Sequence, residues 1–153
     1  MVKWLRKAAA QNFANAQYNL GNCYYNGQGV ERDIAEAMKW YRKAAEQNDP
    51  DAQYAFGVGY RDGQGVTKDE GEMVKWYRRA AERNYANAQY NLGVCCANGQ
   101  GVTKDEREAV RWYSRSLRGR NSDSIQSPAP SSMWSIIMPG FSGSLTTWPS
   151  SNS

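Results

Sequence analysis

One phrase of 36 residues recurs along the chain, and this period constrains the fold more strongly than any other feature of the sequence. The first complete copy covers residues 16–51, and the phrase returns at Ala52 and again at Ala88. Each copy contains the letters A-Q-Y, then G-Q-G-V, then W-Y. Repeats of this length are typical of solenoids, in which each unit buries its apolar face by stacking on its neighbours. The sequence therefore predicts an all-α solenoid of stacked helix pairs.

Each unit reads as two helices joined by a glycine loop. In the first complete copy, small and apolar residues recur at helical spacing over residues 16–24 and again over residues 37–45, as on a buried helical face. Gly27 is expected to end the first of these helices in the left-handed conformation that glycine adopts readily. The second helix is expected to begin near Asp33.

The residues at the helix starts fit known capping patterns. Thr67 and Thr103 each stand three residues before a glutamate, which predicts a capping box at the start of the two later second helices. The first copy lacks this threonine, so Asp33 with Glu36 is expected to take the same role. Asp49, which precedes a proline, is expected to cap the next first helix.

The period divides the chain into a solenoid at residues 1–117 and a tail at residues 118–153. The solenoid begins in the middle of a unit, because the segment around Trp4 matches the segment around Trp76 in register. A half unit and three further units predict about seven helices. The expected bounds are residues 1–12 for the half unit and about 13–48, 49–84 and 85–117 for the units.

The tail differs from the repeats in composition. It holds four of the five prolines in the chain, is rich in serine and shows no helical period. Such a segment buries too little apolar surface to offset the entropy of ordering, so we expect it to be largely disordered. Residues 124–127 fall where the period calls for A-Q-Y-N. A frameshifted or truncated continuation of the array is therefore a second interpretation of the tail.

The composition excludes several classes of function. Histidine is absent, which removes Ser-His-Asp catalysis, Cys-His catalysis and histidine-ligated zinc. The net charge of +4 is mild and gives no independent case for nucleic acid. No apolar run approaches the roughly 20 residues that span a bilayer. We expect no catalytic residue, no metal, no cofactor and no membrane partner.

The three cysteines are too few and too oddly placed for a disulfide framework. Cys23 and Cys95 occupy the same repeat position two units apart, which places their sulfurs beyond disulfide reach. Free thiols favour a reducing compartment such as the cytoplasm, and the first residues read as repeat rather than as a signal peptide. The compartment is otherwise unknown from the sequence.

Two further motifs have structural interpretations. The Gly-Gln-Gly loops lack the preceding strand and the following Lys-Ser/Thr of a phosphate loop, so we interpret them as helix connections. Basic residues gather on the second helices beside Trp and Tyr, which resembles an RNA-binding pattern. We interpret these aromatics as core and the charges as a solvated outer face. The basic residues are Lys39, Arg42, Lys43, Lys75, Arg78, Arg79, Arg111 and Arg115.

Taken together, the pattern A-Q-Y-x-L/F-G, then G-Q-G-V, then K/R-W-Y-x-K/R-A-A resembles the Sel1-like repeat family, relatives of the tetratricopeptide repeats. The resemblance covers about residues 1–117. It implies a right-handed superhelix of antiparallel helix pairs, and a role as an adaptor that holds partner proteins, in bacteria among other settings. Tetratricopeptide and pentatricopeptide repeats lack the Gly-x-Gly-Val loop.

The candidate binding face follows from this comparison with related solenoids, where the first helices build the concave wall. Tyrosine suits recognition because it combines a large apolar ring with a hydrogen-bonding tip, and asparagine pairs with backbone amides. The alternative interpretation is that Tyr18, Tyr54 and Tyr90 merely seal adjacent units. The candidate partner-binding residues are Asn15, Tyr18, Asn22, Tyr25, Asp51, Tyr54, Arg61, Asn87 and Tyr90.

We therefore expect a noncatalytic scaffold that binds a peptide or protein segment on its concave face. One alternative is an enzyme, because some secreted members of the family resemble β-lactamase-like proteins. Those members carry a cysteine pair in each unit, whereas this chain has alanines at 44–45 and 80–81 where the partner cysteine is expected. A truncated array without a function of its own is the other alternative. An exposed terminal helix is also expected to permit end-to-end self-association.

Overall fold

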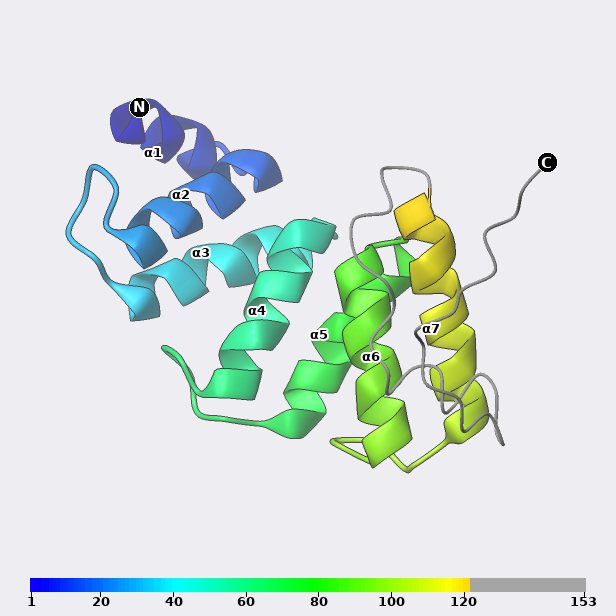
Figure 1. The fold of residues 1–153 in the computed structure, drawn as a ribbon. Helices are drawn as coiled ribbons and strands as arrows, with labels where there is room; N and C mark the ends of the chain where they lie inside the picture. Colours follow the sequence, from blue (N-terminus) through cyan, green and yellow to red (C-terminus); the bar gives the residue numbers. More distant parts are fainter. Residues whose placement is uncertain (122–153) are drawn as a thin grey trace, which may run out of the picture.

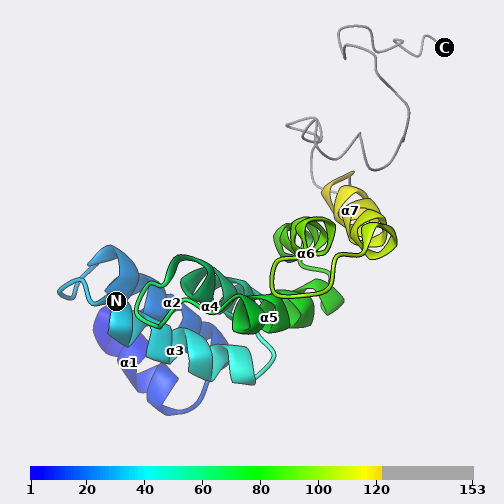
Figure 2. The same ribbon diagram turned by 90° about the horizontal axis from the view of Figure 1, so that it is seen from below.

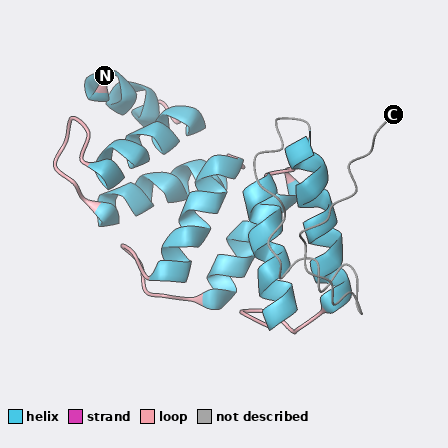
Figure 3. Cartoon of the chain, viewed as in Figure 1, coloured by secondary structure: helices cyan, strands magenta, loops and turns pink. Residues whose placement is uncertain are grey.

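The computed structural model describes residues 1–121 as seven α-helices, and this range contains no strand (Figures 1 and 3). Among these helices, none has the length and apolar character that crossing a membrane requires. The helices are α1 (Val2–Ala10), α2 (Ala14–Asn26), α3 (Ile34–Glu46), α4 (Pro50–Asp62), α5 (Glu70–Glu82), α6 (Ala86–Asn98) and α7 (Glu106–Asn121).

The predicted tail lies mostly outside the described residues. Helix α7 continues past residue 117, where the sequence analysis placed the end of the solenoid, and runs to Asn121. The remainder of the tail, including the segment at residues 124–127, is not described by the structure.

The helices pack in sequence order and form a helical solenoid. Helices α2 and α3, α4 and α5, and α6 and α7 form antiparallel pairs, and α1, α3 and α5 contact the helix that follows them. Figure 2 shows the pairs following one another along a curved row. The predicted all-α repeat architecture is confirmed.

Inside each unit, the loop between the two helices begins at a glycine with a left-handed backbone. It ends at an aspartate that caps the second helix. Gly27 ends α2 with a φ of 70°, as predicted. The carboxylate of Asp33 accepts a hydrogen bond from the backbone N–H of Glu36 at 3.0 Å, and its own N–H donates to the carbonyl of Tyr24 at 2.9 Å. One residue therefore caps the second helix and ties it to the end of the first.

The predicted capping boxes at Thr67 and Thr103 are wrong. Helix α5 is capped by Asp69, whose carboxylate accepts from the N–H of Glu72 at 3.1 Å. In the next unit Asp105 accepts from the N–H of Glu108 at 3.0 Å. The threonines lie earlier in the loop. The aspartate takes the capping position because its backbone N–H also donates to a carbonyl of the preceding helix. The arrangement at Asp33 is therefore the rule in all three units.

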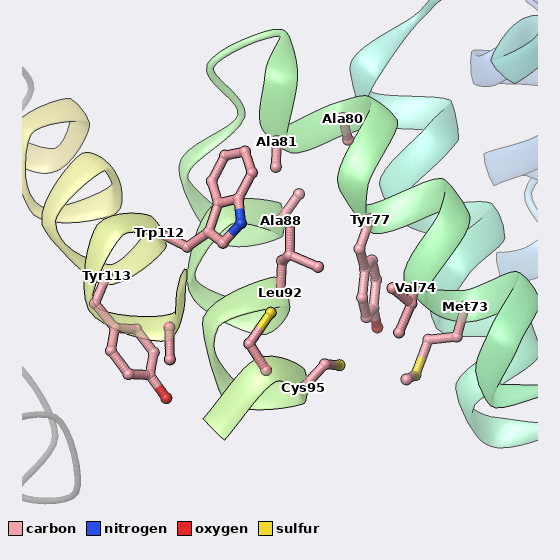
Figure 4. Close-up of a cluster of buried hydrophobic side chains, with 12 residues drawn as sticks. Met73, Val74, Tyr77, Ala80, Ala81, Ala88, Leu92, Cys95, Trp112 and Tyr113 are labelled. Atoms are coloured by element: carbon pink, nitrogen blue, oxygen red, sulfur yellow. The ribbon is translucent and has the colours of Figure 1, made fainter. Parts of the chain in front are cut away.

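Glycine in the first helix lets a tyrosine ring lie against the helix backbone. A Cβ placed on Gly57 would meet Cδ1 of Tyr77 at 2.8 Å, and the pairs Gly21 with Tyr41 and Gly93 with Tyr113 repeat this contact. Tyr77 is only 1% exposed and belongs to a buried cluster that includes alanines of α5, α6 and α7. Figure 4 shows this cluster around Leu92 and Trp112.

A buried glutamine joins each unit to the one before it. The Nε2 atom of Gln53 in α4 donates to the carbonyl of Ala45 in α3 at 3.1 Å, and Gln89 makes the same bond to Ala81 at 3.1 Å. Gln17 bonds to Ala9 at 3.2 Å. All three glutamines are buried. The A-Q-Y motif thus encodes the bond between successive units.

We predict that Gln53→Met lowers the free energy of unfolding by about 1 kcal/mol, the usual contribution of one intramolecular hydrogen bond. The methionine keeps the side-chain length but does not donate to the Ala45 carbonyl. Urea denaturation followed by circular dichroism measures the change. Gln28→Met, at an exposed loop position, is the control and is expected to shift stability by less than about 0.5 kcal/mol. Equal stability of the two variants would contradict the role of the buried bond.

A second prediction concerns Gly57→Ala. Alanine is the better helix former by about 1 kcal/mol, yet its Cβ would press on the Tyr77 ring, and overpacking of this kind costs about 1–3 kcal/mol. We expect a net loss of stability, measured by thermal unfolding. Gly71→Ala in the exposed first turn of α5 is the control. Its Cβ would meet no ring, only Oδ1 of the capping Asp69 at 3.3 Å, so any loss of stability should be smaller than in Gly57→Ala. A stabilised Gly57→Ala protein would show that the contact with Tyr77 is loose.

Candidate functional site

The nine residues predicted to bind a partner all lie on the first helices α2, α4 and α6. Four are exposed, namely Asn15, Asp51, Arg61 and Asn87. The other five are half-buried, namely Tyr18, Asn22, Tyr25, Tyr54 and Tyr90. We call the surface that these nine residues mark the first-helix face.

The repeated tyrosines of this face pack against the second helix of their own unit. The ring centroids of Tyr18 and Tyr41 are 5.7 Å apart, those of Tyr54 and Tyr77 are also 5.7 Å apart, and those of Tyr90 and Tyr113 are 5.6 Å apart. The first member of each pair keeps part of its surface in solvent, whereas the second is buried. Each first-helix tyrosine therefore supports its unit and remains accessible.

Tyr54 is the centre of a group of polar and aromatic side chains on the face. Its ring lies 5.2 Å from that of Tyr85, which immediately precedes α6. Its hydroxyl oxygen accepts a hydrogen bond from Nδ2 of Asn91 at 3.1 Å. Burial and the nearby Asp51 carboxylate, to which Tyr85 is hydrogen-bonded, raise the pKa of the Tyr85 hydroxyl to about 12. Tyr85 therefore stays protonated and donates at neutral pH.

Tyr85 was missed by the sequence analysis. An aromatic residue stands at this position in two units, as Phe13 and Tyr85, but the middle unit has Asp49 there. The position therefore does not belong to the repeated phrase. The aromatic residues at this position in two units, each just before a first helix, were the signal in the sequence that could have identified Tyr85.

Two predicted residues form internal hydrogen bonds. Asn22 accepts a bond from the hydroxyl of Tyr41 at 2.6 Å through its Oδ1 atom. The hydroxyl of Tyr25 donates to Oε1 of Gln64, in the loop after α4, at 2.9 Å. Asn22 therefore joins the two helices of its own unit and Tyr25 joins its unit to the next, although each side chain keeps some exposed surface.

Arg61 lies at the end of α4 and pairs with its neighbour. Its Nε and Nη2 atoms donate to the two carboxylate oxygens of Asp62 at 2.9 and 3.1 Å. These hydrogen bonds hold the pKa of Asp62 below its usual range and raise that of Arg61. The pair is partly exposed, so it contributes little to stability.

Several basic residues of the second helices have an acidic or an aromatic partner. Arg78 donates to the carboxylate of Glu108 at 2.8 Å, which joins α5 to α7, and Arg42 pairs with Glu46 at 3.0 Å. The guanidinium of Arg79 lies 4.8 Å from the ring of Trp76. Trp76 and Trp112 are buried as predicted, whereas Trp40 is half-buried and Trp4 is 73% exposed.

The three cysteines provide no reactive thiol. Cys23, Cys95 and Cys96 are free and buried, and burial raises the pKa of Cys95 to about 11. Such a thiol stays protonated at neutral pH and is a poor nucleophile. Within residues 1–121, no three acidic or cysteine side chains gather as a metal site would require. The arrangement on the first-helix face is suited to recognition by contact and hydrogen bonding.

Comparison with known proteins agrees with this architecture. The structure of a Sel1 repeat protein from Oxalobacter formigenes is 43% identical in sequence, with a TM-score of 0.73, over 76% of this chain and 48% of that one. The structure of c5321, a protective antigen present in uropathogenic Escherichia coli strains, is 44% identical, with a TM-score of 0.74. That match covers 76% of this chain and 25% of the antigen. The chain thus spans less than half the length of either protein.

A third structure shows the fold alone. Cysteine rich protein B of Helicobacter pylori is 24% identical, with a TM-score of 0.61, over 78% of this chain and 90% of that one. A comparison with curated protein sequences gave no match. The family model of the Sel1 repeat matches four times, at residues 2–13, 14–49, 50–85 and 86–120. Because these matches cover most of the chain, the protein belongs to the Sel1 repeat family.

Proposed function

We propose that the chain is a noncatalytic interaction module that binds an extended protein segment along the first-helix face. Proteins of the Sel1 repeat fold are commonly protein–protein interaction scaffolds. The observation that carries the proposal for this chain is the group formed by Tyr54, Tyr85 and Asp51. It combines partly exposed rings with an exposed carboxylate and lies midway along the row of helices.

The chemistry of this group suits a polypeptide ligand. Tyrosine offers rigid apolar area and a hydroxyl at little cost in rotamer entropy, which is why it is common in binding surfaces. Asn15 and Asp51 occupy the same position one unit apart and are both exposed. Their side-chain oxygens offer acceptors for the backbone N–H groups of an extended segment. A segment that follows the row would meet one such acceptor in each unit.

We expect the double variant Asn15→Lys with Asp51→Lys to weaken peptide binding at least tenfold. Linear peptides are first selected from a displayed random library on the immobilised wild-type chain, and their affinities are measured by fluorescence anisotropy. The lysines remove the acceptors and add bulk. Both positions are exposed, so we expect the fold to tolerate the loss of the bond between Tyr85 and Asp51. Circular dichroism checks that helicity is retained.

Lys39→Glu with Arg111→Glu is the matched control for this experiment. Both residues are exposed on second helices, and the variant lowers the net charge by four, which is close in size to the rise of three in the first-helix variant. We expect its peptide affinities to equal those of the wild type. If the control loses binding and the first-helix variant keeps it, the binding face has been placed on the wrong side of the row.

We also propose that the exposed end at α1 supports association with a second copy. Trp4 is 73% exposed and Phe13 is 59% exposed, whereas Trp76 at the equivalent position of a later unit is covered by Phe56 and is only 5% exposed. Burying such rings is worth about 25 cal/mol per Å² of apolar surface. Sedimentation velocity over a range of concentrations should show dimers that Trp4→Ser with Phe13→Ser removes. A wild-type chain that is monomeric at every concentration would contradict this proposal.

A further inference from the structure

The three units serve as internal controls for one another, and one contact between units is present in the first junction and absent from the second. In the first junction, between the unit α2–α3 and the unit α4–α5, Tyr25 reaches across and donates to Gln64 at 2.9 Å. In the second junction, between α4–α5 and α6–α7, the equivalent residues are Arg61 and Gln100. Arg61 bonds to Asp62 instead. The second junction therefore lacks the tyrosine side chain that spans the first junction, which we call the aromatic plug.

A cavity of about 220 Å³ lies in this second junction. We call it the junction pocket. Its wall is formed by the end of α4, by α5 and α6, and by the loop after each of α4 and α6. The polar residues that line it include Arg61, Lys68, Tyr77, Asn91 and Gln100. The pocket adjoins the group around Tyr54, because Asn91 donates its hydrogen bond to Tyr54.

The hydroxyl of Tyr77 is buried beside this pocket without a hydrogen-bond partner among the described residues. In the preceding unit the equivalent hydroxyl, that of Tyr41, donates to Asn22 at 2.6 Å. Val58 replaces that asparagine in the second unit. Tyr77 is 1% exposed, and a buried hydroxyl without a partner is costly and rare. Figure 4 shows Tyr77 of α5 and Cys95 of α6, both of which line the pocket, on facing helices.

The charges around the pocket favour an anion. Arg61 and Lys68 contribute two positive charges to the lining and Glu70 contributes one negative charge, while Asp62, which pairs with Arg61, lies outside the lining. Burial raises the pKa of the Tyr77 hydroxyl, and the positive charge of Arg61 acts against this rise, so Arg61 lies close enough to influence that group. The Arg61–Asp62 pair is partly exposed and therefore weak. An incoming carboxylate can share the guanidinium, which presents five donors.

We propose that the junction pocket binds a carboxylate of the bound protein segment, with Arg61 and Lys68 supplying the charge and the Tyr77 hydroxyl donating a hydrogen bond. The inference rests on the proposed function and names one feature of the ligand, an acidic group that enters the second junction. Charge-assisted bonds to Arg and a buried hydroxyl would make the pocket selective for the carboxylate over its neutral amide.

The test uses blocked amino acids as probes, titrated into the full ¹⁵N-labelled chain by NMR. The side-chain amide signals of Asn91 and Gln100 report on the pocket directly. We expect saturable shifts with N-acetyl-glutamate N-methylamide and at least tenfold weaker binding of the corresponding glutamine derivative. Binding should weaken as salt is raised, because exposed charges are screened. N-acetyl-alanine, which carries only a terminal carboxylate, distinguishes a chain end from an acidic side chain as the source.

Two variants place residues of the first junction at the equivalent positions of the second. Arg61→Tyr introduces the plug that Tyr25 provides, and we expect it to abolish binding of the glutamate probe. Val58→Asn supplies the acceptor that Asn22 provides to Tyr41, and we expect about fivefold weaker binding because the Tyr77 hydroxyl is then occupied. Arg107→Tyr makes the same exchange at an exposed position on α7 and should bind like the wild type. Thermal melts check that each variant is folded.

Several results would overturn the proposal. Equal affinity for the glutamate and glutamine probes would show that charge is not recognised. Tighter binding of N-acetyl-tyrosine amide would show that the pocket takes an aromatic plug instead. Shifts that persist unchanged in Arg61→Tyr would place the probe elsewhere. The library peptides separate this inference from the proposed function. Suppose that they bind Arg61→Tyr as tightly as wild type but do not bind the Asn15→Lys, Asp51→Lys variant. The first-helix face is then supported as the binding surface, and the carboxylate pocket is contradicted.

Discussion

The bond from a buried glutamine to the end of the preceding helix is the contact on which the solenoid depends. Helices α1, α3 and α5 each carry an alanine pair in their last turn, and the chain then turns through an asparagine with a left-handed backbone, at Asn12, Asn48 and Asn84. The glutamine five residues later reaches back to the alanine carbonyl. A short turn and a buried bond leave little freedom in how one unit sits on the next. The same geometry therefore recurs at each junction.

This regularity makes departures from the repeat informative. A residue that recurs in every unit, such as the glycine beneath each buried tyrosine, is explained by packing. A residue that differs at an equivalent position changes one junction while the backbone stays the same. The exchange of Tyr25 for Arg61 and of Asn22 for Val58 opens one junction and leaves one hydroxyl without a partner. Differences of this kind are the places where a repeat protein acquires a particular ligand.

Much of the fold could be predicted from the period, because glycine, proline and apolar spacing act locally. Gly27 and Asp49 end and start helices through their own backbone and side chain, so their roles were readable. The caps at Thr67 and Thr103 were misplaced because threonine and aspartate both cap helices. Only the bond from the Asp69 N–H to the Tyr60 carbonyl selects between them. That bond joins two helices and leaves no trace in local spacing.

The candidate site was harder to predict from the sequence than the fold, for a related reason. Helical phase placed Tyr18, Tyr54 and Tyr90 together, but phase does not tell which polar side chains are already bonded within the protein. Asn22 proved to be an acceptor for Tyr41, and Tyr85 joined the group from a position outside the repeated phrase. The pocket beside Tyr77 depends on residues from three helices. A sequence pattern of one unit cannot contain it.

The two sides of the row differ in how far their polar groups are already satisfied. On the second helices, Arg78 and Arg42 are neutralised by glutamates, and Lys43, Arg79 and Arg115 lie over tryptophan rings at 4.4–4.8 Å. A ligand on that side would have to displace existing contacts. On the first helices, Asn15 and Asp51 are exposed and the tyrosines keep part of their surface free. Asn15 and Asp51 already accept bonds from Asn19 and Tyr85, yet their oxygens can accept a second bond without losing the first. The first-helix face is therefore the side on which a partner can add contacts.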